Sequence, residues 1–275
     1  ELKFHENNSH TTATAMTEDI KQKLREWADR YETADFIKSD PVQFPRLAAQ
    51  GLNLSRLTEK EQRRVETVAV ITSWLSYGDR KQIIKTAAML FDLVTEEGFF
   101  ENQRHFQFNS PNRLYRFFTW ADFFDLCERL SLIYGKYGTL ESCVLALSEN
   151  PLDGLIQAFK GVKGFPKDKD SACKRLCMLT RWLVRQDSPV DLGIWTSFDT
   201  ADLIIPLDTH VHRMAQELGL TRFRYADMRA SLEITKALRE VFPDDPTKGD
   251  FALFGYGVEH HRNNQNDNKF HKMIE

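Results

Sequence analysis

The chain lacks the features of a membrane or secreted protein. Among its 275 residues there is no run of about twenty uninterrupted apolar residues, the length that a membrane-spanning helix needs. The polar, threonine-rich start lacks the apolar stretch of a secretory signal. Four cysteines are too few for a disulfide framework in a chain this long. We therefore expect a protein of the reducing cytoplasm, with no membrane partner.

Several catalytic signatures are missing as well. The sequence contains no His-Asp dipeptide and no His-Glu-x-x-His motif, which argues against two classes of metal-dependent hydrolase. An Asp-x-His-x-His run does occur at 208–212, as in metal-dependent amidohydrolase barrels. Those barrels need both histidines on one strand and many βα units afterwards, whereas helical spacing would turn His210 and His212 to opposite sides. We predict no metal site.

The sequence has ample material for a hydrophobic core, with 41% hydrophobic residues, 20 Phe and 5 Trp. Apolar residues recur at helical spacing through most of the chain, which predicts an all-α fold. The one strand candidate is 203–205, which Pro206 ends. We expect a disordered tail at 1–16, one helical unit of two interwoven lobes at 17–260, and a polar tail at 261–275.

Start signals place four of the helices. Thr17 is a predicted N-cap, and Thr58 with Glu61 forms a predicted capping box. Ser171 is predicted to cap a helix that runs to Arg185. Asp208 is predicted to cap the next helix, which ends at Gly219.

The charge distribution permits two readings. The net charge of −3 argues against a nucleic-acid-binding domain, which is often strongly basic. From Lys160 to Arg185, however, eight Lys/Arg face two Asp, a local charge of +6. Such a run is typical of a phosphate-binding surface, and equally of an ordinary solvated helix face.

A specific motif lies around Asp208. The run Pro206-Leu207-Asp208-Thr209-His210-Val211, with Arg213 and then 217–220 (Glu-Leu-Gly-Leu), resembles the catalytic-aspartate helix of the helix-hairpin-helix DNA glycosylase superfamily. By spacing alone, Asp208 could be an ordinary N-cap. Upstream, the run 172–178 is similar in kind to the lysine helix of that superfamily, with Lys174 near its start.

The sequence also departs from the superfamily's usual pattern. The gap from Lys174 to Asp208 is 34 residues, longer than in most members, and Gly161 and Gly164 stand well before the lysine. The archaeal 8-oxoguanine glycosylase branch has a comparably long gap, and the chain most resembles that branch and a related uncharacterised bacterial family. The resemblance implies a helix-hairpin-helix-like element, a cleft between the lobes, and no cofactor. No cysteine follows Cys177, so we expect no iron–sulfur cluster.

The resemblance assigns the chemistry to two residues. Asp208 would stabilise the positive charge that develops on the sugar as the base leaves. Lys174 would attack C1′ and form a Schiff base, which requires a neutral amine. Lys174 taken alone could equally be a solvated lysine of a helix start.

Other residues are candidates for contacts with DNA. Trp195 and Phe198 could line a pocket for a flipped base, or pack under a loop. Asp191 could read a base edge, or cap a turn. The predicted contacts to the DNA backbone are Gly161, Lys163, Gly164, Lys167, Lys169, Arg175, His210 and Arg213.

The sequence therefore predicts a base-excision DNA glycosylase, with or without an AP-lyase activity, acting on duplex DNA that carries an oxidised purine. Two alternatives remain open. One is a catalytically silent nucleic-acid-binding protein of the same fold, favoured by the long gap and the acidic total charge. The other is a helical protein-interaction scaffold.

Overall fold

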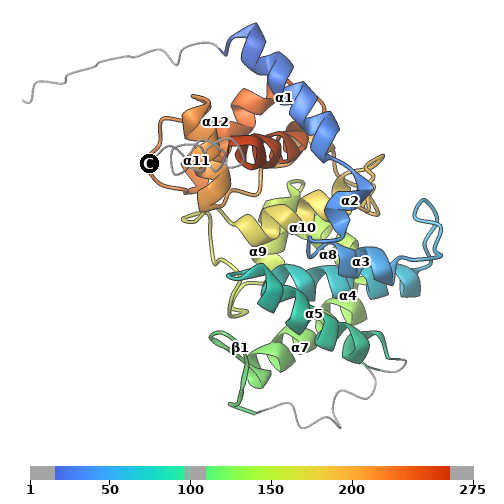
Figure 1. The fold of residues 1–275 in the computed structure, drawn as a ribbon. Helices are drawn as coiled ribbons and strands as arrows, with labels where there is room; N and C mark the ends of the chain where they lie inside the picture. The colour runs from blue at the N-terminus through green and yellow to red at the C-terminus, as the bar shows by residue number, and fades with distance from the viewer. Residues whose placement is uncertain (1–15, 97–98, 100–109, 261–275) are drawn as a thin grey trace, which may run out of the picture.

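A computed structural model describes residues 16–96, 99 and 110–260 (Figure 1). The predicted all-α class is confirmed, because helices make up most of these residues. Within this described part, no helix is long and apolar enough to cross a membrane. The tails predicted at 1–16 and 261–275 lie, apart from Met16, outside the described residues.

The first five helices precede the gap in the description. They are α1 (Glu18–Tyr31), α2 (Ala34–Ile37), α3 (Gln43–Ala48), α4 (Glu59–Leu75) and α5 (Arg80–Thr95). Two of the predicted starts are confirmed here. Thr17 accepts a hydrogen bond from the Ile20 amide, and Thr58 and Glu61 form a complete capping box.

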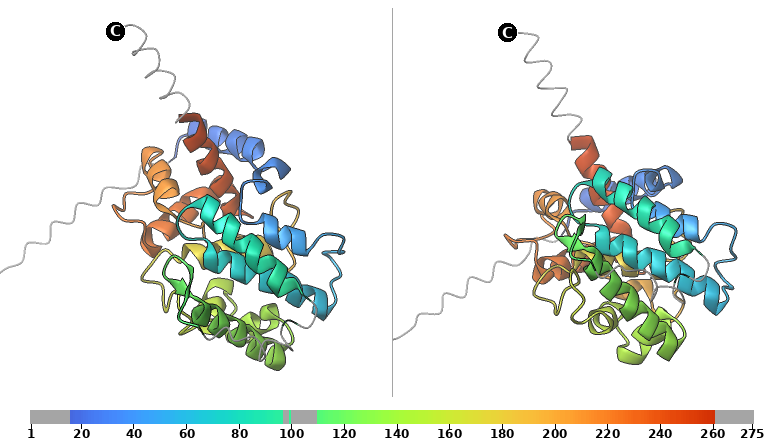
Figure 2. Two further views of the ribbon diagram at one scale, coloured as in Figure 1. Left: turned by 60° about the horizontal axis from the view of Figure 1, so that its bottom comes forward. Right: turned by 90° about the horizontal axis from the view of Figure 1, so that it is seen from below.

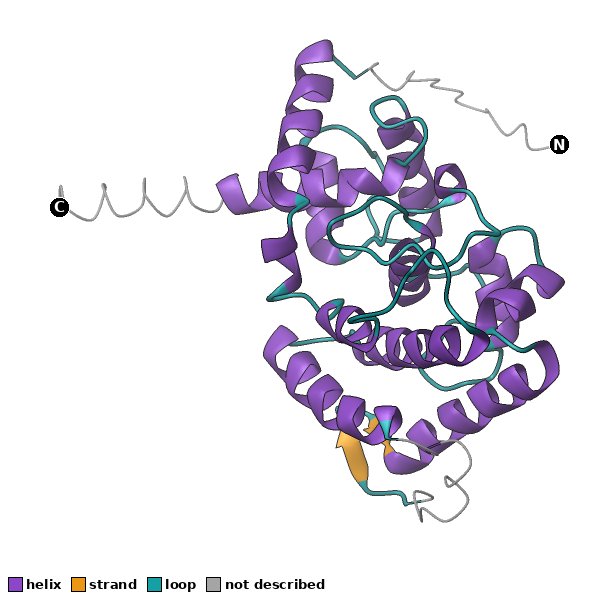
Figure 3. Cartoon of the chain, turned by 90° about the vertical axis from the view of Figure 1, so that its right-hand side faces the viewer, coloured by secondary structure: helices purple, strands orange, loops and turns teal. Residues whose placement is uncertain are grey.

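The described chain after the gap holds a short hairpin and the remaining elements. They are β1 (Arg113–Tyr115), β2 (Phe118–Thr119), α7 (Trp120–Tyr137), α8 (Leu140–Leu147), α9 (Pro151–Ala158), α10 (Lys174–Val184), η1 (Thr200–Asp202), α11 (Thr209–Glu217), α12 (Met228–Arg239) and η2 (Pro246–Lys248). Residues 249–260 are also helical. The antiparallel strands lie at one end of the molecule (Figure 3).

The strand predicted at 203–205 is wrong, since this segment is extended but pairs with no strand in the described structure. Its three apolar side chains are buried, as the pattern requires. The Ile205 amide, however, donates to the Thr235 hydroxyl of α12 instead of to a neighbouring strand. A side-chain acceptor has thus taken the place of a ladder partner.

Helix α4 is the centre of the larger of two hydrophobic clusters. Every residue from Val65 to Leu75 is buried, which confirms the central place that its apolar faces predicted. It packs against α3, α5 and α10. This cluster takes in most core residues from Val42 to Ile204, together with Met228 and Phe251.

The second hydrophobic cluster joins the two ends of the described chain. It combines α1 with α11, α12 and the helix at 249–260. Both views of Figure 2 show the blue N-terminal helix beside the red C-terminal helix. The chain thus begins in one cluster, crosses into the other and returns, as expected for interwoven lobes. Just before α10, Ala172 belongs to the second cluster and Cys173 to the first, so this segment marks their junction.

Candidate functional site

Asp208 is the N-cap of α11, as the sequence predicts. Its Oδ1 accepts hydrogen bonds from the amides of His210 at 2.9 Å and Val211 at 2.8 Å. At the other end Gly219 has φ +71°, and the Leu220 amide donates to the Ala215 carbonyl at 2.8 Å. This hydrogen bond is the expected helix-ending motif. The capped start fixes the Asp208 carboxylate and leaves its second oxygen, Oδ2, for another partner.

Lys174 is the first residue of α10, and the predicted cap at Ser171 is wrong. The N-cap is Cys173, whose backbone is left-handed (φ +50°), so the helix cannot extend back to Ser171. The Ser171 hydroxyl instead accepts from the Cys173 amide at 3.4 Å in a local turn. The result places the lysine at the point where α10 emerges from the junction of the two clusters.

The structure brings the two predicted catalytic residues together. The Lys174 Nζ lies 3.3 Å from the Asp208 Oδ2, and both side chains are 37% exposed. Burial raises the pKa of Asp208, but the Lys174 charge and the two capping amides outweigh it and hold that pKa below its usual value. The carboxylate is therefore ionised at neutral pH. The pair is a half-exposed ion pair between the first turns of two helices.

The long connection between α10 and α11 is held by backbone hydrogen bonds. The Trp182 carbonyl accepts from the amides of Leu192 at 2.8 Å and Gly193 at 3.2 Å. The Leu183 carbonyl accepts from the Trp195 amide at 2.7 Å. This part of the connection therefore folds back along the end of α10, which explains how residues 34 positions apart can meet.

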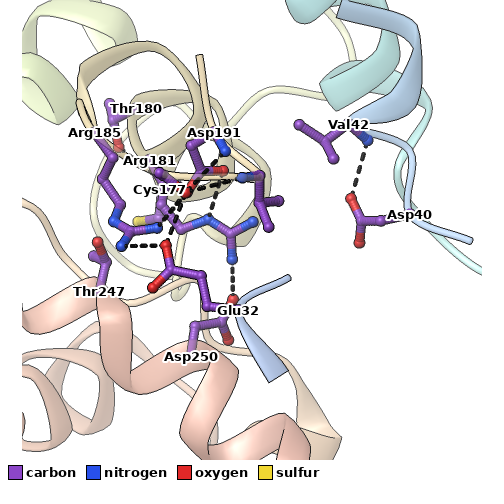
Figure 4. A network of polar contacts seen from close by, with 12 residues as sticks. Glu32, Asp40, Val42, Cys177, Thr180, Arg181, Arg185, Asp191, Thr247 and Asp250 are labelled. Atoms are coloured by element: carbon purple, nitrogen blue, oxygen red, sulfur yellow. Dashed lines mark hydrogen bonds and ion pairs between the residues drawn. The ribbon is translucent and has the colours of Figure 1, made fainter. Parts of the chain in front are cut away.

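A buried ion network also holds the connection, and it corrects the prediction for Asp191 (Figure 4). Asp191 is 2% exposed. Its Oδ1 lies 3.3 Å from the Arg181 Nε, and its Oδ2 lies 2.6 Å from the Arg185 Nη1. Both carboxylate oxygens are thus engaged by arginines, one within α10 and one at its C-cap, so this side chain does not read a base edge in this structure. Its role is to tie the connection to α10.

Trp195 and Phe198, which the sequence predicts either to line a base pocket or to pack under a loop, are both buried in this structure. Trp195 is fully buried, and its Nε1 donates to the Glu66 Oε1 at 2.9 Å. Phe198 is buried beside it, with ring centroids 5.7 Å apart. A buried indole with a satisfied N–H is a core side chain. The sequence placed both aromatics correctly between the key helices but could not show which way they point.

Glu66 is a buried carboxylate that the sequence reasoning missed, and it links α4 to other parts of the fold. Besides Trp195, it accepts from the amides of Leu140 at 2.8 Å and Glu141 at 3.1 Å, at the start of α8. Burial raises its pKa to about 7, against the lowering effect of these donors. A single Glu inside the apolar run of α4 was the available signal, since buried carboxylates are rare without partners.

The predicted DNA-binding cations do not form one free face. Lys163 pairs with Asp122 at 2.8 Å, and Lys169 pairs with Asp153 at 2.5 Å. Arg175 is half-buried and donates to the Trp74 carbonyl at 3.0 Å. Arg181 and Arg185 of the same basic run are buried in the ion network. The local charge of +6 is therefore largely neutralised by neighbouring carboxylates.

The remaining predicted DNA contacts differ in their exposure. Lys167, Gly161 and Arg213 are exposed. His210 is half-buried, and its Nε2 is 2.5 Å from where a Cβ on Gly257 would lie, so it packs against the C-terminal helix. Gly164 is packed inward: an added Cβ would come within 2.5 Å of the Phe118 ring. His210 and Gly164 therefore contribute to the packing of the fold.

Asp250 is a second carboxylate that borders the Lys174–Asp208 pair, and the sequence reasoning did not single it out. It lies on the helix at 249–260 and pairs with the Arg181 Nη1, about two turns along α10 from the lysine. Burial raises its pKa to about 6; the charge of Arg181 opposes this rise, and Asp208 adds to it. The site thus sits where α10, α11 and the C-terminal helix meet.

The predicted cleft between the lobes stays a prediction. An open pocket lies in another part of the molecule, on α3 and the turn after it, and neither Lys174 nor Asp208 lines it. The packing of α9 on α10, joined by the loop with Gly161 and Gly164, matches the order of the predicted helix-hairpin-helix-like element. Its identity as such an element is likewise untested.

The fold and site define an all-α protein with a lysine–aspartate pair at the starts of two helices. The chain belongs to the family described as "Protein of unknown function (DUF2400)", which matches residues 52–259, or 208 of its 275 residues. This span contains Lys174, Asp208, Asp250 and Glu66. Comparison with curated proteins and with solved structures finds no match.

Proposed function

We propose that this protein is a base-excision DNA glycosylase with an associated AP-lyase activity. The observation that carries the proposal is the 3.3 Å approach of the Lys174 Nζ to the Asp208 Oδ2. The two residues were predicted from separate motifs, as nucleophile and as charge-stabilising carboxylate. Their meeting at a half-exposed position is what such a mechanism needs, whereas two unrelated surface residues would have no reason to converge.

The proposed reaction uses Lys174 as the nucleophile. Its ammonium first gives up a proton, and the free amine then bonds to C1′ of the sugar while the bond from C1′ to the base breaks. The base leaves with the bonding electron pair and is protonated. Loss of a further proton and opening of the sugar ring give an imine between Nζ and C1′, the Schiff base from which strand cleavage proceeds.

Asp208 acts through its charge and its fixed position. Cleavage of the glycosidic bond develops positive charge on the sugar, and an ionised carboxylate close to C1′ lowers the energy of that transition state. The pKa of Asp208 is held below its usual value, so the carboxylate is ionised at neutral pH. The two capping amides fix Oδ1, so Oδ2 keeps its orientation toward Lys174 and the substrate.

The proposed partner is duplex DNA carrying an oxidised purine, the lesion class that the resemblance to the archaeal 8-oxoguanine branch suggests. Since Trp195 is buried, a flipped base would need other neighbours of the pair. Asp250 and the side of α10 that bears Arg181 are the adjacent polar groups. We also propose a cytoplasmic location, which the four unpaired cysteines support.

The proposal is tested by base release from a panel of duplexes, each with one damaged base, read out by alkaline strand cleavage. We expect the wild-type protein to release one or more oxidised purines. Asp208→Asn should lower the rate by at least about a hundredfold, as typical for loss of a charge-stabilising group. Asp92→Asn, at an exposed aspartate of α5, is the matched charge control for Asp208→Asn, and Lys85→Gln, at an exposed lysine of the same helix, is the control for lysine variants. Release that persists in Asp208→Asn, or that is absent from the wild type on every lesion, would contradict the proposal.

A further inference from the structure

Two aromatic rings stand exposed on neighbouring turns of the molecule. Tyr77, in the turn between α4 and α5, is 49% exposed, and Phe117, in the turn between β1 and β2, is 48% exposed. Their ring centroids lie 5.6 Å apart in an edge-to-face arrangement. Large aromatic rings are usually buried, so a contacting pair at the surface suggests a binding surface.

Two guanidinium groups lie close to the same ring. The Arg116 Cζ is 5.1 Å from the Tyr77 ring centroid, and the Arg175 Cζ is 6.0 Å from it. We call Tyr77, Arg116, Phe117 and Arg175 the Tyr77 platform. It combines flat π surfaces with positive charge. Arg175 belongs to the basic run at 160–185, and most other members of that run pair with acidic side chains.

The backbone under the Tyr77 platform is held in place. The Tyr115 hydroxyl donates to the Tyr77 carbonyl at 2.5 Å, which ties the hairpin to the turn after α4. Phe118 points inward and stacks on Trp74 with centroids 3.9 Å apart, while its neighbour Phe117 points out. A platform fixed by buried contacts can receive a ligand without first being ordered.

Arg116 supplies a second sign of function. Its φ of +51° is in the left-handed region, which is costly for a residue with a long side chain. Its guanidinium passes over Gly78, where an added Cβ would come within 2.5 Å of Nη1. The strained backbone conformation therefore occurs at Arg116 itself, the residue whose guanidinium lies beside the Tyr77 ring.

The Tyr77 platform is joined directly to the helix that bears the candidate nucleophile. Arg175 follows Lys174 in the chain, and its guanidinium also donates to the Trp74 carbonyl at 3.0 Å. Its own carbonyl accepts from the Ser73 hydroxyl at 2.6 Å. The end of α4 and the start of α10 are thus fixed to each other, so the platform keeps a fixed position relative to Lys174, the residue that precedes Arg175.

We propose that the Tyr77 platform binds an unpaired nucleobase of a nucleic-acid strand, with Arg116 and Arg175 contacting the adjoining phosphates. The choice of a nucleic-acid strand as the ligand rests on the proposed function. Binding to the platform does not require the protein to be catalytically active. Nucleobases stack on aromatic rings regardless of their sequence, and arginine combines with both rings and phosphates. An acidic peptide would satisfy the arginines but would leave the two exposed rings unused.

The test compares two fluorescent strands of equal length and charge, one of thymidine nucleotides and one of abasic nucleotides, by anisotropy with the full chain. The wild-type protein should bind the base-bearing strand more tightly, by about 5- to 150-fold for one stacked base. Tyr77→Ala should remove most of this difference, and Tyr77→Phe should keep it. Because half of the ring is exposed, circular dichroism should show both variants folded.

Tyr225→Ala is the matched control. Tyr225 is 66% exposed and has the Arg224 Cζ 5.6 Å from its ring, but it lies between α11 and α12. The Tyr225→Ala variant should keep the wild-type preference for the base-bearing strand. Equal affinity of the wild type for both strands, or an equal loss in Tyr77→Ala and Tyr225→Ala, overturns the assignment. Base release that remains while Tyr77→Ala binds both strands like the wild type would refute the platform alone and leave the glycosylase proposal standing.

Discussion

The Lys174 Nζ lies 3.3 Å from the Asp208 Oδ2, although the two residues are 34 positions apart in the sequence. The residues between them do not form a free loop. Backbone hydrogen bonds to the end of α10, the Asp191 ion pairs and the Trp195–Glu66 hydrogen bond hold the first part of this connection. The position of the pair is therefore a property of the whole connection, and variants far from the pair should affect it.

The two roles of Asp208 can be separated by substitution. Asn caps a helix as well as Asp does, so Asp208→Asn should lose the ion pair and base release but little cap stability. Asp208→Ala should lose the cap as well, which costs about 1 kcal/mol in the free energy of unfolding. Urea denaturation of both variants beside the wild type measures the difference. If Asp208→Asn and Asp208→Ala lower the free energy of unfolding equally, the cap does not contribute to stability.

Asp191→Ala should be destabilising. It removes the carboxylate that Arg181 and Arg185 share. An unpaired buried charge costs about 3–5 kcal/mol, and we expect a smaller loss here because Asp250, Glu32 and Asp245 still pair with the two arginines. Thermal unfolding would show this as a fall in Tm. Asp199→Ala, which removes a cap of the exposed η1, is the matched control and should cost much less. A Tm of Asp191→Ala equal to that of the control would show that the ion network does not hold the connection.

Glu66 should make stability depend on pH in the direction opposite to a salt-bridged acid. Its pKa rises from 4.5 to about 7 on folding, so between these values the folded protein binds more protons than the unfolded chain. The free energy of unfolding should therefore fall as the pH rises from 4.5 to 7, by about 3 kcal/mol at most. Glu66→Gln should flatten this part of the pH profile. An identical slope in the variant would refute the assignment.

Gly164→Ala should destabilise the protein through packing and backbone strain. Gly164 has φ +98°, and an added Cβ would come within 2.5 Å of Phe118 and 2.8 Å of the Trp74 Nε1. Gly161 has φ +88° but open space around it, so Gly161→Ala is the matched control for the backbone term. We expect Gly164→Ala to lower Tm by more than Gly161→Ala. Equal shifts would mean that the loop yields without disturbing Trp74.

Local signals in the sequence predicted much of the fold. Caps at Thr17, Thr58 and Asp208 depend on a few neighbouring residues, and all three are present. Ser171 failed as a cap because Cys173 is left-handed where the chain passes from one cluster to the other, and no local pattern in the sequence predicts that conformation. The strand at 203–205 failed because a burial pattern cannot distinguish a ladder partner from the Thr235 hydroxyl.

Some features of the candidate site could likewise be predicted from the sequence, and others could not. The pairing of Lys174 with Asp208 was expected from the resemblance of their two sequence runs to the superfamily, which assigned both residues to one site. The burial of Asp191 and Trp195 did not follow, because it depends on Arg181, Arg185 and Glu66, which reach them from other helices. Long-range partners of buried polar groups are the part of this site that the sequence alone does not disclose.

The most direct test of the central claim is borohydride trapping on a duplex with one abasic site, followed by mass spectrometry of the cross-linked peptide. The account predicts a covalent adduct on Lys174, absent in Lys174→Gln and present in the Lys85→Gln control. An adduct on a different lysine, or trapping by Lys174→Gln at the wild-type level, would contradict the assignment of the nucleophile. No adduct at all, with base release still measured, would contradict the lyase and leave a glycosylase that depends on Asp208 and water.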